Sequence, residues 1–125
     1  MTISPFQRSN LEKLAAYLDT LPVDYDKLDM SGFAVSDLVT EIELGDFSPK
    51  VLHQCGTAAC AAGHGPSAGI RINRTLDGSW HNYTERAFGA TDFDDLWDRC
   101  FDGDLGGNHI DAAARIHTWL AENPA

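Results

Sequence analysis

The residues best suited to chemistry gather in one short stretch, residues 53–64, which holds two of the three cysteines and two of the five histidines. His53, Cys55, Cys60 and His64 supply four ligands of the kinds that zinc binds in a tetrahedron. Their Cys-x4-Cys spacing differs from the usual zinc-finger spacings, and a free cysteine is often a small packing residue. We therefore expect Cys55 and Cys60 to be structural, with no bound metal and no cofactor. A zinc site is the alternative.

A nucleophilic thiol is a second way to use the same stretch. Cys55 precedes Gly56-Thr57, the expected start of a helix, and a helix N-terminus favours the thiolate form. His53, His64 or His81 would then serve as the base. The sequence identifies no acidic or amide side chain that would orient this base. A metal- or thiol-dependent small enzyme centred on Cys55–His64 is therefore the alternative function, and catalysis is not the leading expectation.

The motif Cys-Gly-Thr-x-Ala-Cys-x-x-Gly, from Cys55 to Gly63, resembles the signature of a family of small uncharacterised proteins from bacterial and phage genomes. In that family a Trp usually follows the final Gly, whereas this chain has His64. The resemblance implies a fold and no particular activity, and the phage association implies a role in interaction. Four further segments carry it: Asn10 to Leu14, Tyr25 to Met30, Phe88-Gly89 and Ala113 to Ile116.

The chain is strongly acidic, with 19 Asp and Glu against nine Lys and Arg, and a formal charge of −10. A protein that binds the phosphate backbone needs a basic footprint, so we expect no direct nucleic-acid binding. An acidic protein is well suited to a partner with a basic surface. The leading functional expectation is therefore a small acidic soluble protein that binds another protein, as an accessory or an inhibitor. Mimicry of nucleic-acid charge would be a special case.

The acidic residues concentrate between residues 92 and 104, where Arg99 is the single cation among six aspartates. Helix dipoles favour acids only within the first turn. Asp98, Asp102 and Asp104 lie beyond it, and we expect these three residues to bind the partner. The alternative is a solvated acidic face.

Length and composition predict one globular domain, residues 1–125, because 125 residues with 43% hydrophobic composition can bury a core. The sequence contains no run of 18 apolar residues, so no membrane span is expected. The first ten residues lack an apolar signal-peptide region. An odd number of cysteines and the absence of a signal indicate a reduced, cytoplasmic protein.

Periodicity predicts a mainly α fold of about five short helices around a small central helix over residues 58–63, with Thr57 as its N-cap. The first helix is expected to start at Ser9 with Glu12 completing a capping box, and to end at Leu21-Pro22. Its apolar stripe is Leu11, Leu14, Ala15 and Leu18. Three later helices are expected from Ser79 to Gly89, from Thr91 or Asp92 to Cys100, and from Asn108 to Leu120, each capped by its first residue. Their apolar faces are expected to be Trp80, Tyr83 and Ala87 in the first, Phe93, Leu96, Trp97 and Cys100 in the second, and Ala113, Ile116 and Leu120, flanked by Ala112 and Trp119, in the third. Residues 33–44 are expected to form a helix or a loop, with a short strand over residues 39–44 as the alternative, and residues 70–74 fit a minor strand or extended arm.

Overall fold

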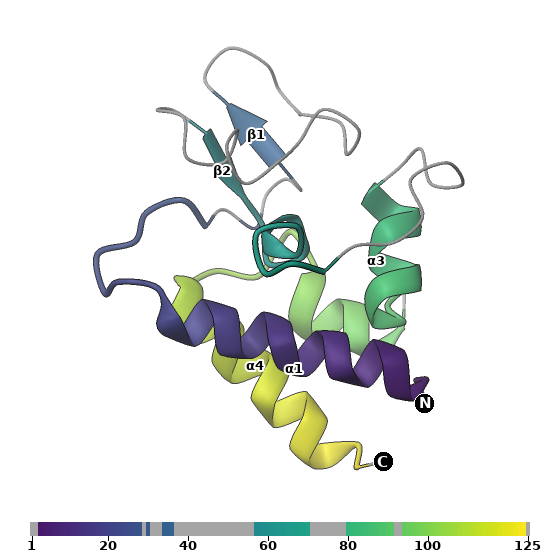
Figure 1. Cartoon of the computed structure of the whole chain (residues 1–125). Coiled ribbons are helices and arrows are strands. Elements are labelled where there is room, and N and C mark those ends of the chain that lie inside the picture. Colours follow the sequence, from purple (N-terminus) through teal and green to yellow (C-terminus); the bar gives the residue numbers. More distant parts are fainter. Residues whose placement is uncertain are drawn as a thin grey trace.

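The computed structural model describes residues 3–28, 30, 34–36, 57–70, 80–91 and 94–124. Within those residues the fold is mainly α, as the periodicity predicts, with two short strands beside the helices (Figure 1). None of the described helices is both long and apolar enough to cross a membrane. His53 and Cys55 lie outside the described residues, as do residues 37–44 and 71–74, so the expectations for them stay predictions. Residues 34–36 form a strand, so the expected helix or loop is wrong at these three positions.

Helix α1 (Pro5–Thr20) begins earlier than the sequence analysis predicts. The N-cap is Ser4, whose hydroxyl accepts the Gln7 backbone N–H at 3.1 Å, while the Gln7 side chain accepts the Ser4 backbone N–H at 2.9 Å. Ser9 is therefore inside the helix, and the prediction that it caps the helix is wrong. Ser-x-x-Gln is the same type of capping box as Ser-x-x-Glu, and Pro5 suits the first helical position.

Helices α1 and α4 (His109–Glu122) pack antiparallel and contact each other more extensively than any other pair of described elements. Figure 1 shows the two helices side by side and running in opposite directions. The start of α4 meets the end of α1 through a contact of His109 with the Leu18 carbonyl, whereas Arg8 near the start of α1 donates to the Leu120 carbonyl. Asn108 caps α4, as predicted, and the structure adds a capping box in which the Asp111 side chain accepts the Asn108 backbone N–H. The predicted inner faces of both helices are buried: Leu11, Leu14, Ala15 and Leu18 in α1, and Ala112, Ala113, Ile116, Trp119 and Leu120 in α4.

Helix α3 (Trp80–Phe88) packs across α1, and its Ala87 carbonyl accepts the Asn10 side-chain N–H at 2.8 Å. The predicted face of Trp80, Tyr83 and Ala87 is buried. Gly89 follows the helix with a φ of 79°, a conformation that glycine adopts without strain. The predicted end of this helix is therefore confirmed.

Residues 94–101 form a capped helical turn that passes into the π-helical segment η4 (Trp97–Phe101). Its cap differs from the predicted Thr91 or Asp92. Asp94 accepts the Trp97 backbone N–H at 2.7 Å and the Thr91 backbone N–H at 2.7 Å. Asp94 takes this role because its carboxylate has two oxygens and can bind donors on both sides of the turn.

The stretch expected to form a central helix is a strand followed by one tight turn. Strand β2 (Thr57–Ala59) pairs antiparallel with β1 (Ala34–Ser36), and only Ala62–His64 form a 3₁₀ turn, η2. The prediction of a helix over residues 58–63 with Thr57 as N-cap is therefore wrong. A helix this short gains few hydrogen bonds for the cost of its first turn, whereas strand pairing supplies partners for the backbone of residues 57–59.

Most of this stretch is buried in the core, although it does not form the expected helix. Side chains of residues 59–62 and His64 are buried. Gly65 lies so close to the Tyr83 ring that a Cβ at this position would overlap the Tyr83 hydroxyl. That hydroxyl donates to the Ile70 carbonyl at 2.7 Å, which joins α3 to the end of the turn. Small residues are therefore needed here for close approach.

Candidate functional site

The acidic run divides into carboxylates that hold the fold together and carboxylates that do not. Asp94 caps its helical turn and also accepts the Thr91 hydroxyl at 2.9 Å. Asp95 accepts the Trp119 indole N–H at 3.1 Å and lies 3.6 Å from Arg99, which ties η4 to α4. Both residues therefore have structural roles. Asp92 lies outside the described residues.

Arg99, the one cation of the run, is engaged by acids on two elements. Its guanidinium donates to Glu122 on α4 at 2.8 Å. This hydrogen bond is the main cause that raises the pKa of Arg99 above its ordinary value, and the charges of Glu122 and Asp95 act in the same direction. Arg99 therefore offsets the negative charges of Glu122 and Asp95. Among the described residues, no ion pair joins Arg99 to Asp98.

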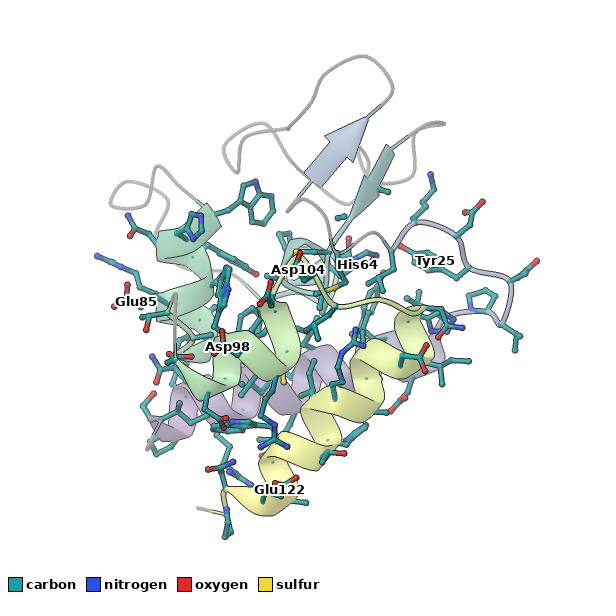
Figure 2. The ribbon with its side chains drawn as sticks, turned by 180° about the vertical axis from the view of Figure 1, so that it is seen from behind. Tyr25, His64, Glu85, Asp98, Asp104 and Glu122 are labelled. Carbon is teal, nitrogen blue, oxygen red and sulfur yellow. The ribbon has the colours of Figure 1, made fainter. Side chains whose placement is uncertain are left out.

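The three predicted binding residues, Asp98, Asp102 and Asp104, occupy η4 and the loop that follows it. Asp102 is half-buried, and its carboxylate accepts the Asp104 backbone N–H at 3.0 Å, so it stabilises a turn. Asp98 and Asp104 are exposed, and no hydrogen bond or ion pair joins their carboxylates to another described residue. Figure 2 labels both, with Asp98 on η4 and Asp104 on the loop. The helix-dipole argument predicts that Asp102 has no structural role, and this prediction is wrong.

Cys60 and His64 belong to one buried hydrogen-bonded turn. His64 is 0% exposed and its Nδ1 donates to the Cys60 carbonyl at 2.7 Å. Its Nε2 accepts the Tyr25 hydroxyl at 2.6 Å. The Cys60 thiol is 2% exposed and its sulfur accepts the Gly63 backbone N–H at 3.5 Å. Metal ligation by His64 would require one of its two hydrogen bonds to break.

No group of three His, Cys, Asp or Glu side chains suited to a metal ion occurs among the described residues. The four-ligand alternative also needs His53 and Cys55, which lie outside them. His81, a candidate base, is on α3 and stacks on Trp97 with ring centroids 5.5 Å apart. Cys100 is buried, and burial raises its pKa to about 12, so its thiol stays protonated at neutral pH.

Tyr25 is a functional candidate that the sequence analysis missed, because that analysis names Tyr25 only as part of a segment that carries the family resemblance. The Tyr25 hydroxyl donates a hydrogen bond to His64, which lies 39 positions away in the sequence (Figure 2). Burial is the main cause that raises the pKa of Tyr25 above its ordinary range, and the charges of Tyr17 and Asp26 add to the effect. The phenol is therefore a neutral hydrogen-bond donor and not a tyrosinate nucleophile. Local patterning contains no signal for so distant a pair.

His109 is the second buried histidine and was likewise missed. It is 1% exposed, and its Nδ1 and Nε2 each lie 2.8 Å from a backbone carbonyl oxygen, of Leu18 and Pro22 respectively. The Tyr25 ring lies edge-on to both histidines, with centroids 5.5 Å from His64 and 5.7 Å from His109. These two buried histidines and the half-buried Tyr25 form a cluster that joins the start of α4 and the end of α1 to the turn η2.

A hollow of about 670 Å³ lies between the start of α1 and the end of α4. Ile3, Pro5 and Trp119 give it apolar walls, and Arg8 also borders it. The Arg8 guanidinium donates to the carbonyls of Leu120 and Asn123 at the end of α4. Arg8 therefore satisfies helix-end carbonyls, a structural task that explains its half-buried position.

Comparison with known proteins assigns no family and no function: no family model, no curated protein and no solved structure matches this chain.

Proposed function

We propose that this protein binds another protein, as an accessory or an inhibitor, and that the partner presents a basic surface to Asp98 and Asp104. The observation that carries the proposal is that both carboxylates are exposed and have no hydrogen bond or ion pair with another described residue. Asp102 lies beside Asp104 and adds negative charge, although its carboxylate also holds a turn. We propose a cytoplasmic setting for this interaction.

The difference between the aspartates that have partners and those that do not favours a binding surface over a solvated acidic face. Asp94 and Asp95 have partners that explain their presence, whereas Asp98 and Asp104 add negative charge to a chain already at −10 without stabilising a contact. Complementary charge raises the rate of encounter and suppresses wrong partners. The resemblance to bacterial and phage proteins is consistent with an interaction role.

The proposal is tested by capture from a bacterial lysate with the immobilised protein, followed by identification of the bound proteins. Wild type should retain a basic protein, and Asp98→Lys with Asp104→Lys should lose it. The matched control is Asp24→Lys with Asp26→Lys, which makes the same change in net charge on the exposed turn around Tyr25. Figure 2 shows Tyr25 and Asp98 on different sides of the molecule.

Salt provides the second readout, measured with the purified partner. Raising the ionic strength should slow association more than it speeds dissociation, because screening weakens long-range attraction. The proposed surface would be contradicted if the Asp98→Lys, Asp104→Lys variant still captured the partner. It would also be contradicted if this variant and the Asp24→Lys, Asp26→Lys control both lost capture to the same extent. Circular dichroism of each variant confirms that the fold is intact.

A further inference from the structure

Arg115 on α4 is a cation that no carboxylate of the described residues balances. Its Nη1 donates to the Gly106 carbonyl at 2.8 Å, whereas its Nε and Nη2 are buried and have no hydrogen-bond partner. No ion pair joins its guanidinium to a described carboxylate. A guanidinium stays charged in proteins, and a buried charge without a partner is costly. An anion bound at Arg115 would therefore be stabilising.

Two groups close to Arg115 do not balance its charge. Asp111, one turn earlier on α4, directs its carboxylate to the Asn108 backbone N–H at 3.1 Å. The Cys100 thiol lies 3.6 Å from the Arg115 carbonyl oxygen. Burial raises the pKa of this thiol to about 12, so it carries no charge at neutral pH.

The two unpartnered nitrogens of Arg115 are the pair that recognises a carboxylate. Nε–H and one N–H of Nη2 point the same way in a guanidinium, and this fork matches the two oxygens of one carboxylate. Nη1 lies outside the fork, and it is the nitrogen that binds Gly106. The fold therefore leaves the bidentate face of Arg115 unsatisfied.

A hollow of about 200 Å³ lies beside Arg115, between η4 and α4. Its walls are formed by Arg99, Ala114, Arg115 and Thr118. A water molecule takes up about 30 Å³ in the liquid, so the hollow has room for a small organic acid. Thr118 is exposed, and no other described residue forms a hydrogen bond with its hydroxyl, which can donate to a ligand.

From these observations we infer that the hollow binds a small free monocarboxylate ion, with Arg115 as its bidentate donor and Thr118 as a second donor. The charges around Arg99 select this class of anion. Glu122 and Asp95 lie 2.8 and 3.6 Å from the Arg99 guanidinium. These two carboxylates repel a dianion such as phosphate more strongly than a monocarboxylate.

Binding requires the Arg115 guanidinium to turn, because protein atoms cover its Nε and Nη2. A single hydrogen bond holds the guanidinium, and its acceptor Gly106 lies in the exposed loop before α4. The turn therefore breaks one hydrogen bond to a neutral carbonyl. Two hydrogen bonds to a carboxylate replace it, and both are strengthened by charge.

The test is a titration of the full chain with sodium acetate, which replaces sodium chloride at constant ionic strength. Proton–nitrogen-15 NMR follows the arginine Nε–H signals, and the signal lost in Arg115→Lys is assigned to Arg115. This signal should shift with acetate and reach saturation. Phosphate at the same ionic strength should bind more weakly than acetate.

The Thr118 backbone amide signal reports acetate binding in the variants as well. Arg115→Lys replaces the fork by a point charge and should weaken acetate binding by about tenfold or more. The matched control is Arg86→Lys, which changes an exposed arginine on α3 and should keep the wild-type affinity. The peptide acetyl-Ala-Glu-Ala-amide, with its Gln counterpart as the neutral control, tests whether a protein side chain is the better source of the carboxylate.

The inference would be overturned by the absence of a saturable shift with acetate, or by equal acetate affinity in wild type and Arg115→Lys. Tighter binding of phosphate would overturn the assignment to a carboxylate, and tighter binding of the Glu peptide would overturn the free acid as ligand. If Arg115→Lys does not fold, the Arg115 signal is assigned through its own backbone in wild type, and the preference for acetate over phosphate decides. Loss of lysate capture in the Asp98→Lys, Asp104→Lys variant has no bearing on this outcome.

Discussion

His64 and His109 are both buried and both lie edge-on to the Tyr25 ring, yet their hydrogen-bond partners differ. His64 faces one carbonyl oxygen and one hydroxyl, which can donate as well as accept. His109 faces two carbonyl oxygens, which only accept. A hydroxyl can donate or accept as the histidine tautomer requires, whereas a carbonyl oxygen can only accept. Two equally buried histidines therefore differ in how much their hydrogen-bond partners can adapt to them.

The largest effect is expected from His109→Leu, which removes both ring nitrogens from the Leu18 and Pro22 carbonyls. A buried hydrogen bond contributes about 0.5–1.5 kcal/mol, and both carbonyls keep a backbone donor, Leu21 and Tyr25 respectively. We expect a loss of about 2–3 kcal/mol in the free energy of unfolding, measured by urea denaturation at pH 7. A loss below about 0.5 kcal/mol would mean that these contacts do not stabilise the fold.

Cys60→Leu tests the packing on the His64 side of the comparison. Cys60 is buried, as are its chain neighbours Ala59 and Ala61. Overpacking of a filled core should reduce stability by about 1–3 kcal/mol. Thermal unfolding measures the change, and Cys60→Ala, which adds no volume, is the control that should cost less. An unchanged melting temperature in Cys60→Leu would contradict tight packing around the turn.

Tyr25→Phe removes the donor to His64 and keeps the ring that contacts both histidines. The buried Nε2 of His64 then lacks its hydroxyl partner, which should cost about 1–2 kcal/mol. The stability loss should be similar at pH 6 and pH 8, because the burial-raised pKa of Tyr25 keeps its phenol neutral across this range. A loss that grows with pH would instead place a titrating group on the His64 side.

His117→Gln is expected to have the smallest effect. His117 lies 2.7 Å from Asp19, but the two side chains are 54% and 51% exposed, so water screens their attraction. Exposed pairs typically contribute less than about 1 kcal/mol. Urea unfolding at low and high salt measures the change. A loss as large as that of His109→Leu would show that exposure does not separate the two histidines of α4.

Local patterns predicted the helices that pack through one regular face. The stripe from Leu11 to Leu18 and the Asn108 capping box lie within a few residues of each other, so hydrogen bonding and burial at one end of a helix can be inferred from neighbours. The position of the first cap was wrong because Ser4 and Ser9 both begin a capping-box pattern. Pro5 favours the earlier start.

Non-local pairing explains what sequence reasoning missed. Residues 57–59 became a strand because residues 34–36 supplied backbone partners, and a sequence window of helical length contains no sign of them. Tyr25 and His64 are 39 residues apart, and the partners of His109 are 91 and 87 residues away. The role of Asp102 was missed for the opposite reason, since its partner Asp104 is only two residues away but forms a turn instead of a helix.

By itself the sequence determined the acidic charge and the buried faces of α1, α3 and α4. It also determined the small side chains of residues 59–62, which allow this stretch to lie in the core. Those properties depend on composition or on contacts within a few turns. Only the tertiary structure decided which aspartates have partners and which hydrogen-bonding groups face His64 and His109. The reason is physical: a histidine's protonation depends on the donors and acceptors within about 3 Å of its nitrogens, and folding brings those groups from distant parts of the chain.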